Sequence, residues 1–157
     1  MIDLIYYPTK HRKNKRELFI ESDIKLNYKA LIPEAGTHLD VYEETKLIGK
    51  VNGTHIELFD TPIPKKQLSF FTWSWVISDS PEQLLSPHME DDKYLLNGEI
   101  VVRVIDRTAV SQNICNIFKK VDTSERFMKL SYDETKVDGI IAFCLLLVDV
   151  SKTFHSI

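Results

Sequence analysis

An acidic loop is the first candidate for chemistry in this sequence. His88 stands close to three consecutive acids, Glu90, Asp91 and Asp92. An imidazole and carboxylates could hold a divalent cation or act as a general base. Consecutive acids usually repel one another and face solvent, and no glycine shapes a turn with spaced calcium ligands. A metal-dependent enzyme is therefore only the third hypothesis, and we expect neither a metal nor a cofactor.

The other residue types that carry catalysis give no recognisable pattern. No serine lies in a Gly-x-Ser-x-Gly turn, and no glycine-rich loop could wrap a phosphate. The only cysteines, Cys115 and Cys144, lie among apolar residues, where a thiol behaves as a small buried hydrophobic group. We therefore expect a protein that is not an enzyme.

The most distinctive local feature is a basic segment at residues 10–16. Its five cations are Lys10, Arg12, Lys13, Lys15 and Arg16. Tyr6 and Tyr7 precede them, and aromatic rings beside cations suit contact with the bases and backbone of a nucleic acid. The whole chain carries a net charge of −3, so its acidic body would repel a polyanion. Nucleic-acid binding is the alternative hypothesis, and an acidic protein partner or a solvated loop are the other interpretations of this segment.

An aromatic stretch at residues 68–77 is the second candidate surface. Side chains alternate between the faces of a strand, so Phe71, Trp73 and Trp75 would share one face. Such a face usually packs in a core, but left exposed it would offer Trp73 and Trp75 to a partner. Edge strands also present unpaired backbone groups to another chain. The first hypothesis is thus a protein–protein interaction or assembly module, which binds another protein or a second copy of itself through a strand edge or this aromatic strand.

Most of the chain shows the two-residue periodicity of β-strands. Strands are predicted at residues 4–7, 17–20, 24–32, 46–51, 54–59, 68–77, 99–105, 127–132 and 140–150. The last of these is apolar on both faces and is expected to be a central strand covered on both sides. Asn52 and Gly53 separate two extended segments and predict a hairpin, because both residues tolerate the positive φ of a tight turn.

Two helices are expected among these strands. Ser80, Pro81 and Gln83 fit the cap, first and third positions of a short helix near residues 80–86. Residues 108–121 place apolar side chains every three or four positions, as in a longer amphipathic helix. The expected fold is α+β and mainly antiparallel β, with a sandwich- or barrel-like sheet.

Length and composition bound the remaining expectations. The chain has 157 residues, of which 43% are hydrophobic and 27% charged, so residues 1–157 are expected to form a single domain with its own core. The longest apolar run, residues 140–148, is about half the length that crosses a bilayer. The first residues lack the apolar stretch of a secretion signal. We therefore expect a soluble, cytoplasmic protein with no membrane partner.

Overall fold

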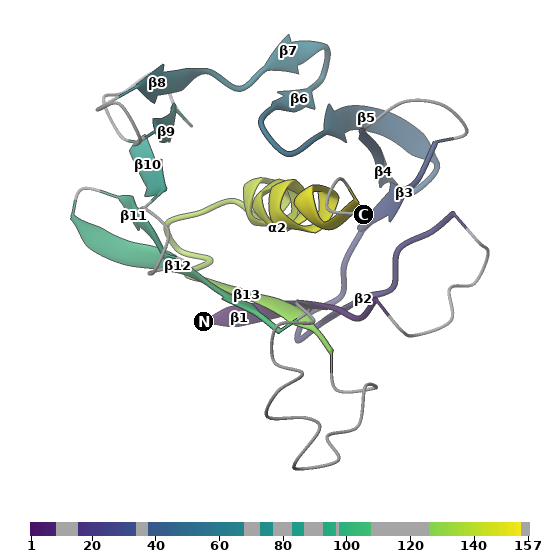
Figure 1. Cartoon of the computed structure of the whole chain (residues 1–157), viewed down its shortest axis with the longest axis horizontal. Coiled ribbons are helices and arrows are strands. Elements are labelled where there is room, and N and C mark those ends of the chain that lie inside the picture. The colour runs from purple at the N-terminus through teal and green to yellow at the C-terminus, as the bar shows by residue number, and fades with distance from the viewer. Residues whose placement is uncertain are drawn as a thin grey trace.

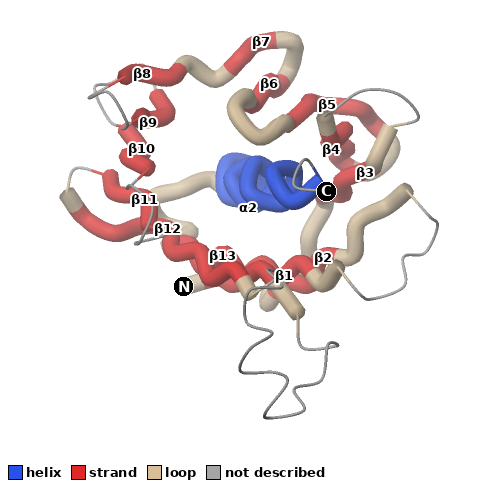
Figure 2. The backbone as a smooth tube through the Cα atoms, in the orientation of Figure 1, coloured by secondary structure: helices blue, strands red, loops and turns tan. Residues whose placement is uncertain are grey.

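The structure is a computed structural model of the chain that describes residues 1–8, 16–33, 38–67, 73–76, 83–86, 93–96, 98–107 and 126–154. In these residues antiparallel strands are arranged around one helix (Figures 1 and 2). The prediction of a mainly antiparallel β fold is confirmed. The helix predicted at residues 108–121 lies outside the described residues.

The larger sheet, sheet A, has eight strands in the order β2-β1-β13-β12-β11-β10-β9-β8. Their bounds are β1 (Ile2–Tyr6), β2 (Ile20–Ser22), β8 (Lys65–Gln67), β9 (Trp73–Val76), β10 (Gln83–Ser86), β11 (Lys93–Leu96), β12 (Glu99–Asp106) and β13 (Met128–Tyr132). The strands predicted at residues 4–7, 99–105 and 127–132 are confirmed as β1, β12 and β13. The strand predicted at residues 68–77 is present as β9 in its described part.

The short helix predicted near residues 80–86 is wrong, because residues 83–86 form β10. Leu84 pairs with Trp75 of β9 on one side and with Leu96 of β11 on the other. A helix of one or two turns is marginal by itself. Hydrogen bonding to a strand on each side therefore outweighs the capping pattern at Ser80.

The smaller sheet, sheet B, has five strands in the order β3-β4-β5-β6-β7. Their bounds are β3 (Tyr28–Leu31), β4 (Leu39–Glu43), β5 (Lys46–Val51), β6 (Ile56–Leu58) and β7 (Thr61–Pro62). The strand predicted at residues 24–32 is shortened to β3. Of the strand predicted at residues 17–20, Glu17 forms an isolated bridge with Leu31 and Ile20 begins β2.

The hairpin predicted around Asn52 and Gly53 is confirmed, since β5 pairs with β6. Its turn differs from the expectation, because neither residue has positive φ. Instead the Asn52 side-chain oxygen accepts hydrogen bonds from the backbone N–H groups of Thr54 and His55, at 2.9 and 2.8 Å. The four-residue loop is therefore closed by the side chain of Asn52. It is not the tight turn of two residues with positive φ that the sequence predicted.

The helix α2 (Gly139–Phe154) occupies the region where we predicted a central strand at residues 140–150, so that prediction is wrong. Every residue from Ala142 to Val148 is buried. The helix packs against β1 and β13 of sheet A and against β3 and β5 of sheet B. A helix covered on all sides is apolar around its whole circumference, which explains why its sequence shows no amphipathic period.

The two open sheets are joined by backbone hydrogen bonds at two places around α2. On one side Ile63 N–H donates to Ile56 in sheet B at 2.7 Å, and Pro64 C=O accepts from Val76 in sheet A at 2.8 Å. On the other side Leu18 N–H donates to Ala30 of β3 at 2.9 Å, just before the chain enters β2. The edges β2 and β3, and β7 and β8, are therefore connected through the chain's own backbone.

Candidate functional site

The two tyrosines that precede the basic segment lie on opposite faces of sheet A. Tyr6 points toward α2 and is 2% exposed, within the core. Tyr7 follows it in the chain, points outward and is partly exposed. Successive side chains of an extended segment point to opposite faces of the sheet, which explains this difference. Of the two, Tyr7 is the one placed to meet a ligand.

The basic segment is described only at its end. Arg16 is exposed, and its Nε donates a hydrogen bond to the Ile32 carbonyl at 2.8 Å. Its own carbonyl accepts from Ile32 N–H at 2.7 Å, which anchors the end of the segment beside β3. The other predicted cations, Lys10, Arg12, Lys13 and Lys15, lie outside the described residues.

The aromatic strand contributes to the core at Trp75, which is 5% exposed. The ammonium of Lys65 lies 4.9 Å from the centre of the Trp75 ring. Because Lys65 and Trp75 are paired residues of β8 and β9, this contact belongs to the sheet itself. Trp73 is in β9, and its side chain is outside the described part of the structure.

The acidic loop cannot be placed, since His88, Glu90, Asp91 and Asp92 lie outside the described residues. Elsewhere, among the residues that the structure describes, no three His, Cys, Asp or Glu side chains gather as a metal site would require. Cys144 is buried in α2, as predicted, and burial raises the pKa of its thiol to about 12. A thiol with that pKa is not a nucleophile at neutral pH.

Three aromatic residues form a row across the outer face of sheet A, the face turned away from α2. Tyr6 pairs with Met128 of β13 and with Ile20 of β2. One residue further along, the same register places Tyr7 between Phe127 and Phe19. The ring centres of Tyr7 and Phe19 are 6.1 Å apart and their planes are inclined at 55°. All three aromatic residues are partly exposed.

Cations border this row on β12 and β13. The guanidinium of Arg107 lies 5.5 Å from the centre of the Phe127 ring, and Arg107 N–H donates to the Phe127 carbonyl at 2.8 Å. Ile105 of β12 pairs with Lys129 of β13. Arg103 lies two positions before Ile105 in β12, and its side chain is exposed. Arg103 and Lys129 form no ion pair with the described residues. We call this surface the basic–aromatic face and define it by Tyr7, Phe19, Arg103, Arg107, Phe127 and Lys129.

Acidic side chains lie on the other half of the same outer face. Asp3 of β1 accepts a hydrogen bond from the Ser131 hydroxyl, and its backbone N–H donates to the Asp23 carboxylate at 3.0 Å. Glu21 is exposed on β2, where it pairs with Ile5. The outer face is therefore divided, with cations over β12 and β13 and acids over β1 and β2. The charged groups of an anionic ligand would therefore lie over the first half and not over the second.

Of the residues on this face, only Tyr7 was predicted from the sequence. The alternation of Arg103, Ile105 and Arg107 indicates that the two arginines share one side of β12. It does not show that Phe127 and Tyr7 lie on neighbouring strands. These two residues are far apart in the sequence, and only the strand order of sheet A brings them together. The register between β1, β12 and β13 was the missing information.

Comparison with known proteins identified no relative of this chain: no protein-family model, no curated protein and no solved structure matched it. Among the described residues, no helix has both the length and the apolar character needed to cross a membrane.

Proposed function

We propose that this chain is a non-catalytic binding protein whose basic–aromatic face holds single-stranded nucleic acid. The observation that carries the proposal is the row formed by Phe19, Tyr7 and Phe127, with Arg107 against its end. Proteins that bind single strands combine aromatic rings, on which bases stack, with cations that follow the phosphates. Both elements are present here on one partly exposed sheet face.

The arrangement favours a single strand over a duplex. Aromatic side chains stack on the faces of bases, and these faces are accessible only when the bases are unpaired. The cations on β12 and β13 lie beside the ring row, so phosphates would run over Arg103 and Lys129 while bases turn toward Phe127 and Tyr7. The basic segment at residues 10–16 begins three positions after Tyr7 and would add charge next to the same row.

The features that suggested assembly through protein contacts have less support. The edges of the two sheets are connected by the chain's own hydrogen bonds at Leu18 and at residues 63–64, which reduces the backbone available for pairing with another chain. Trp75 of the aromatic strand is buried. We therefore place the nucleic-acid hypothesis first.

The proposal is tested by the binding of fluorescent single-stranded RNA and DNA, followed by anisotropy at about 50 and about 200 mM salt. We expect binding that weakens strongly with salt. Arg103→Gln with Lys129→Gln removes two phosphate contacts and should lower the salt slope by about 1.4. Phe127→Ala removes one stacking ring and should weaken binding roughly five- to a hundredfold.

A matched control is provided by Lys46→Gln with Lys50→Gln, which removes the same charge from exposed positions of sheet B. This pair should leave binding nearly unchanged. Absence of salt-sensitive binding by the wild-type chain at about 50 mM salt, or an equal loss in both double variants, would contradict the proposal.

A further inference from the structure

The charge beside the ring row changes sign from one end of the row to the other. Ile5 of β1 pairs with Lys129 of β13 on one side and with Glu21 of β2 on the other. This register lies two residues from that of the rings, so on the outer face Lys129 flanks Phe127 and Glu21 flanks Phe19. Positive charge therefore lies beside one end of the row and negative charge beside the other, with an apolar side chain between them.

The next row of outward side chains repeats this order. Ser131 of β13 pairs with Arg103 of β12 on one side and with Asp3 of β1 on the other, and its hydroxyl donates to the Asp3 carboxylate. Asp23, just past the end of β2, accepts a hydrogen bond from the Asp3 backbone N–H at 3.0 Å. Figure 1 shows these strands next to one another below α2. Two successive rows thus run from a cation on β12 or β13 to acids on or beside β1 and β2.

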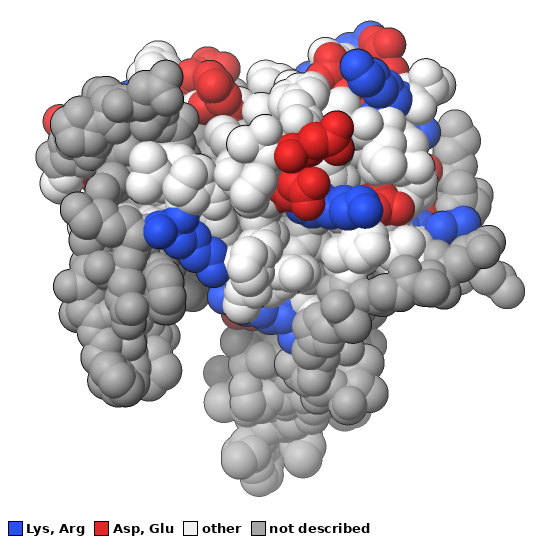
Figure 3. Space-filling view, turned by 90° about the horizontal axis from the view of Figure 1, so that it is seen from above, with Lys and Arg blue, Asp and Glu red and all other residues white. Residues whose placement is uncertain are grey.

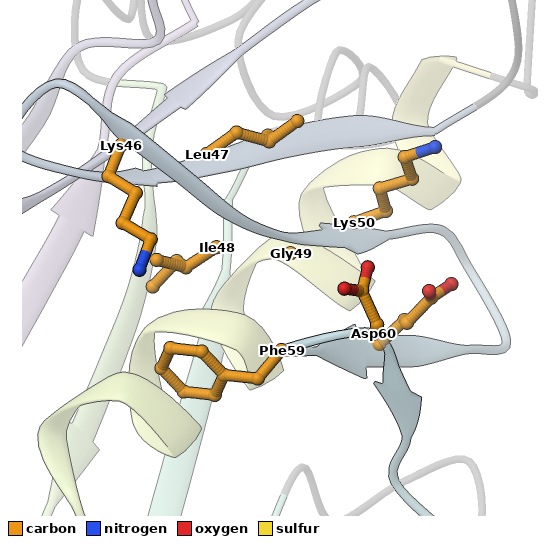
Figure 4. Close-up of a pocket in the computed structure, with 8 residues that line it drawn as sticks. Lys46, Leu47, Ile48, Gly49, Lys50, Phe59 and Asp60 are labelled. Atoms are coloured by element: carbon orange, nitrogen blue, oxygen red, sulfur yellow. The ribbon is translucent and has the colours of Figure 1, made fainter.

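The outer side of sheet B carries the same residue types without this order. The lining of a hollow of about 220 Å³ beside β5 includes Lys46 and Lys50 as well as Glu57 and Asp60. Figure 4 shows Asp60 on the side of Gly49. Figure 3 views the molecule from the side of β5 to β7 and shows acidic and basic side chains next to one another there. This surface supplies a matched control for the charges of sheet A.

A single strand that continued past the ring row would meet the change of sign. If bases stack on Phe127, Tyr7 and Phe19, the next phosphate of a continuing strand lies beyond Phe19, beside Glu21. Like charges brought together at an interface disfavour binding. The last nucleoside of a strand brings a base but no further phosphate. The end of a strand therefore suits this face better than an internal segment does.

We propose that the basic–aromatic face holds the unphosphorylated end of a single strand, with the terminal base on Phe19 and the terminal hydroxyl beside Glu21. This inference rests on the proposed function and specifies its ligand. A carboxylate accepts hydrogen bonds from sugar hydroxyls, whereas it repels a terminal phosphate, which carries a charge of about −1.5 to −2. The rest of the strand leaves over β12, where Arg103 and Arg107 are exposed.

Competition between strands with and without free ends tests this inference. The probe is a single-stranded DNA of about 40 nucleotides labelled on an internal base. Unlabelled competitors of the same sequence are a linear strand with two hydroxyl ends, a closed circle, and strands phosphorylated at the 5′ end, the 3′ end or both. The circle and the doubly phosphorylated strand should require about tenfold or more the concentration of the hydroxyl-ended strand. The singly phosphorylated strand that competes as weakly as the circle identifies which end is bound.

Glu21→Gln removes the charge that excludes internal segments and should reduce the difference between circle and linear strand severalfold. Asp60→Asn is the control, because it removes one acid from sheet B and places a residue that tolerates the φ of 62° at that position. It should leave the difference unchanged.

Two results would overturn the inference and leave the proposed function intact. One is a circle that displaces the probe from the wild-type chain as well as the linear strand does, and the other is a Glu21→Gln variant that keeps the full preference for ends. Failure of every strand to bind at about 50 mM salt would overturn the proposed function, and this inference with it.

Discussion

Single positions show how closely the strands of sheet B approach. A Cβ atom added at Gly49 would lie 2.3 Å from the Glu57 carbonyl oxygen and 2.7 Å from Leu58 Cδ2. The first of these contacts is with backbone, which cannot rotate away as a flexible side chain can. The absence of a side chain at Gly49 therefore permits the pairing of β5 with β6.

At this scale we predict that Gly49→Ala lowers the free energy of unfolding by about 1–3 kcal/mol, because β5 and β6 must separate to admit the methyl group. Urea denaturation measures the loss. Gly53→Ala is the control, since its Cβ would meet only side-chain atoms, Lys152 Cγ at 3.2 Å and Ser151 Oγ at 3.9 Å, and the long Lys152 side chain can move. An equal loss at both glycines would show that close strand approach is not the cause.

The helix α2 is the element on which both sheets pack. Phe143 is fully buried in it, and the Phe143 ring centre lies 5.9 Å from that of Tyr28 in β3. On the opposite side of the core, Leu4 of β1 and Leu130 of β13 are also fully buried. The stability of both sheets should therefore depend on side chains of this one helix.

We predict that Phe143→Ala lowers the free energy of unfolding by about 3–5 kcal/mol, since it removes a buried ring and leaves a cavity between the helix and sheet B. Denaturant unfolding followed by circular dichroism provides the measurement. Lys152→Ala, at an exposed position of the last helical turn, should change stability by no more than about 0.5 kcal/mol. A small effect of the Phe143 substitution would mean that α2 is not central to the core.

At the scale of the whole molecule, the two open sheets and the helix α2 that the described residues form depend on one another. The backbone bonds at Leu18 and at residues 63–64 connect the sheets, but the inner faces of β1, β13, β3 and β5 contact α2. Without the helix these faces would expose apolar side chains to water. The free-energy cost of that exposure is roughly 25 cal/mol for each Å² of apolar surface. The sheets should not persist as an empty shell.

A chain that ends at Asp138 lacks α2 and should therefore lose cooperative unfolding. We expect weak near-ultraviolet circular dichroism and binding of a hydrophobic dye, in contrast to the full-length chain. Retention of a sharp unfolding transition in the shortened chain would show that the strands form a core of their own.

Part of the candidate site could be predicted from the sequence and part could not. The alternation rule predicts that Tyr6 and Tyr7 point in opposite directions, and the apolar surroundings of Cys144 predict its burial. Neither rule states which tyrosine faces solvent. The neighbours of Tyr7, which are Phe19 and Phe127, come from distant segments, and no local pattern relates them.

The sequence by itself determined those features that depend on neighbouring residues: the period-two strands β1, β12 and β13, and the hairpin that joins β5 to β6. The tertiary structure decided the rest. Residues 140–150 form a helix instead of a strand because complete burial requires apolar side chains on every side, and a uniformly apolar run has no period that separates the two conformations. Strand order likewise decided which rings and cations share a face, because pairing between residues as distant as 7 and 127 leaves no trace in local spacing.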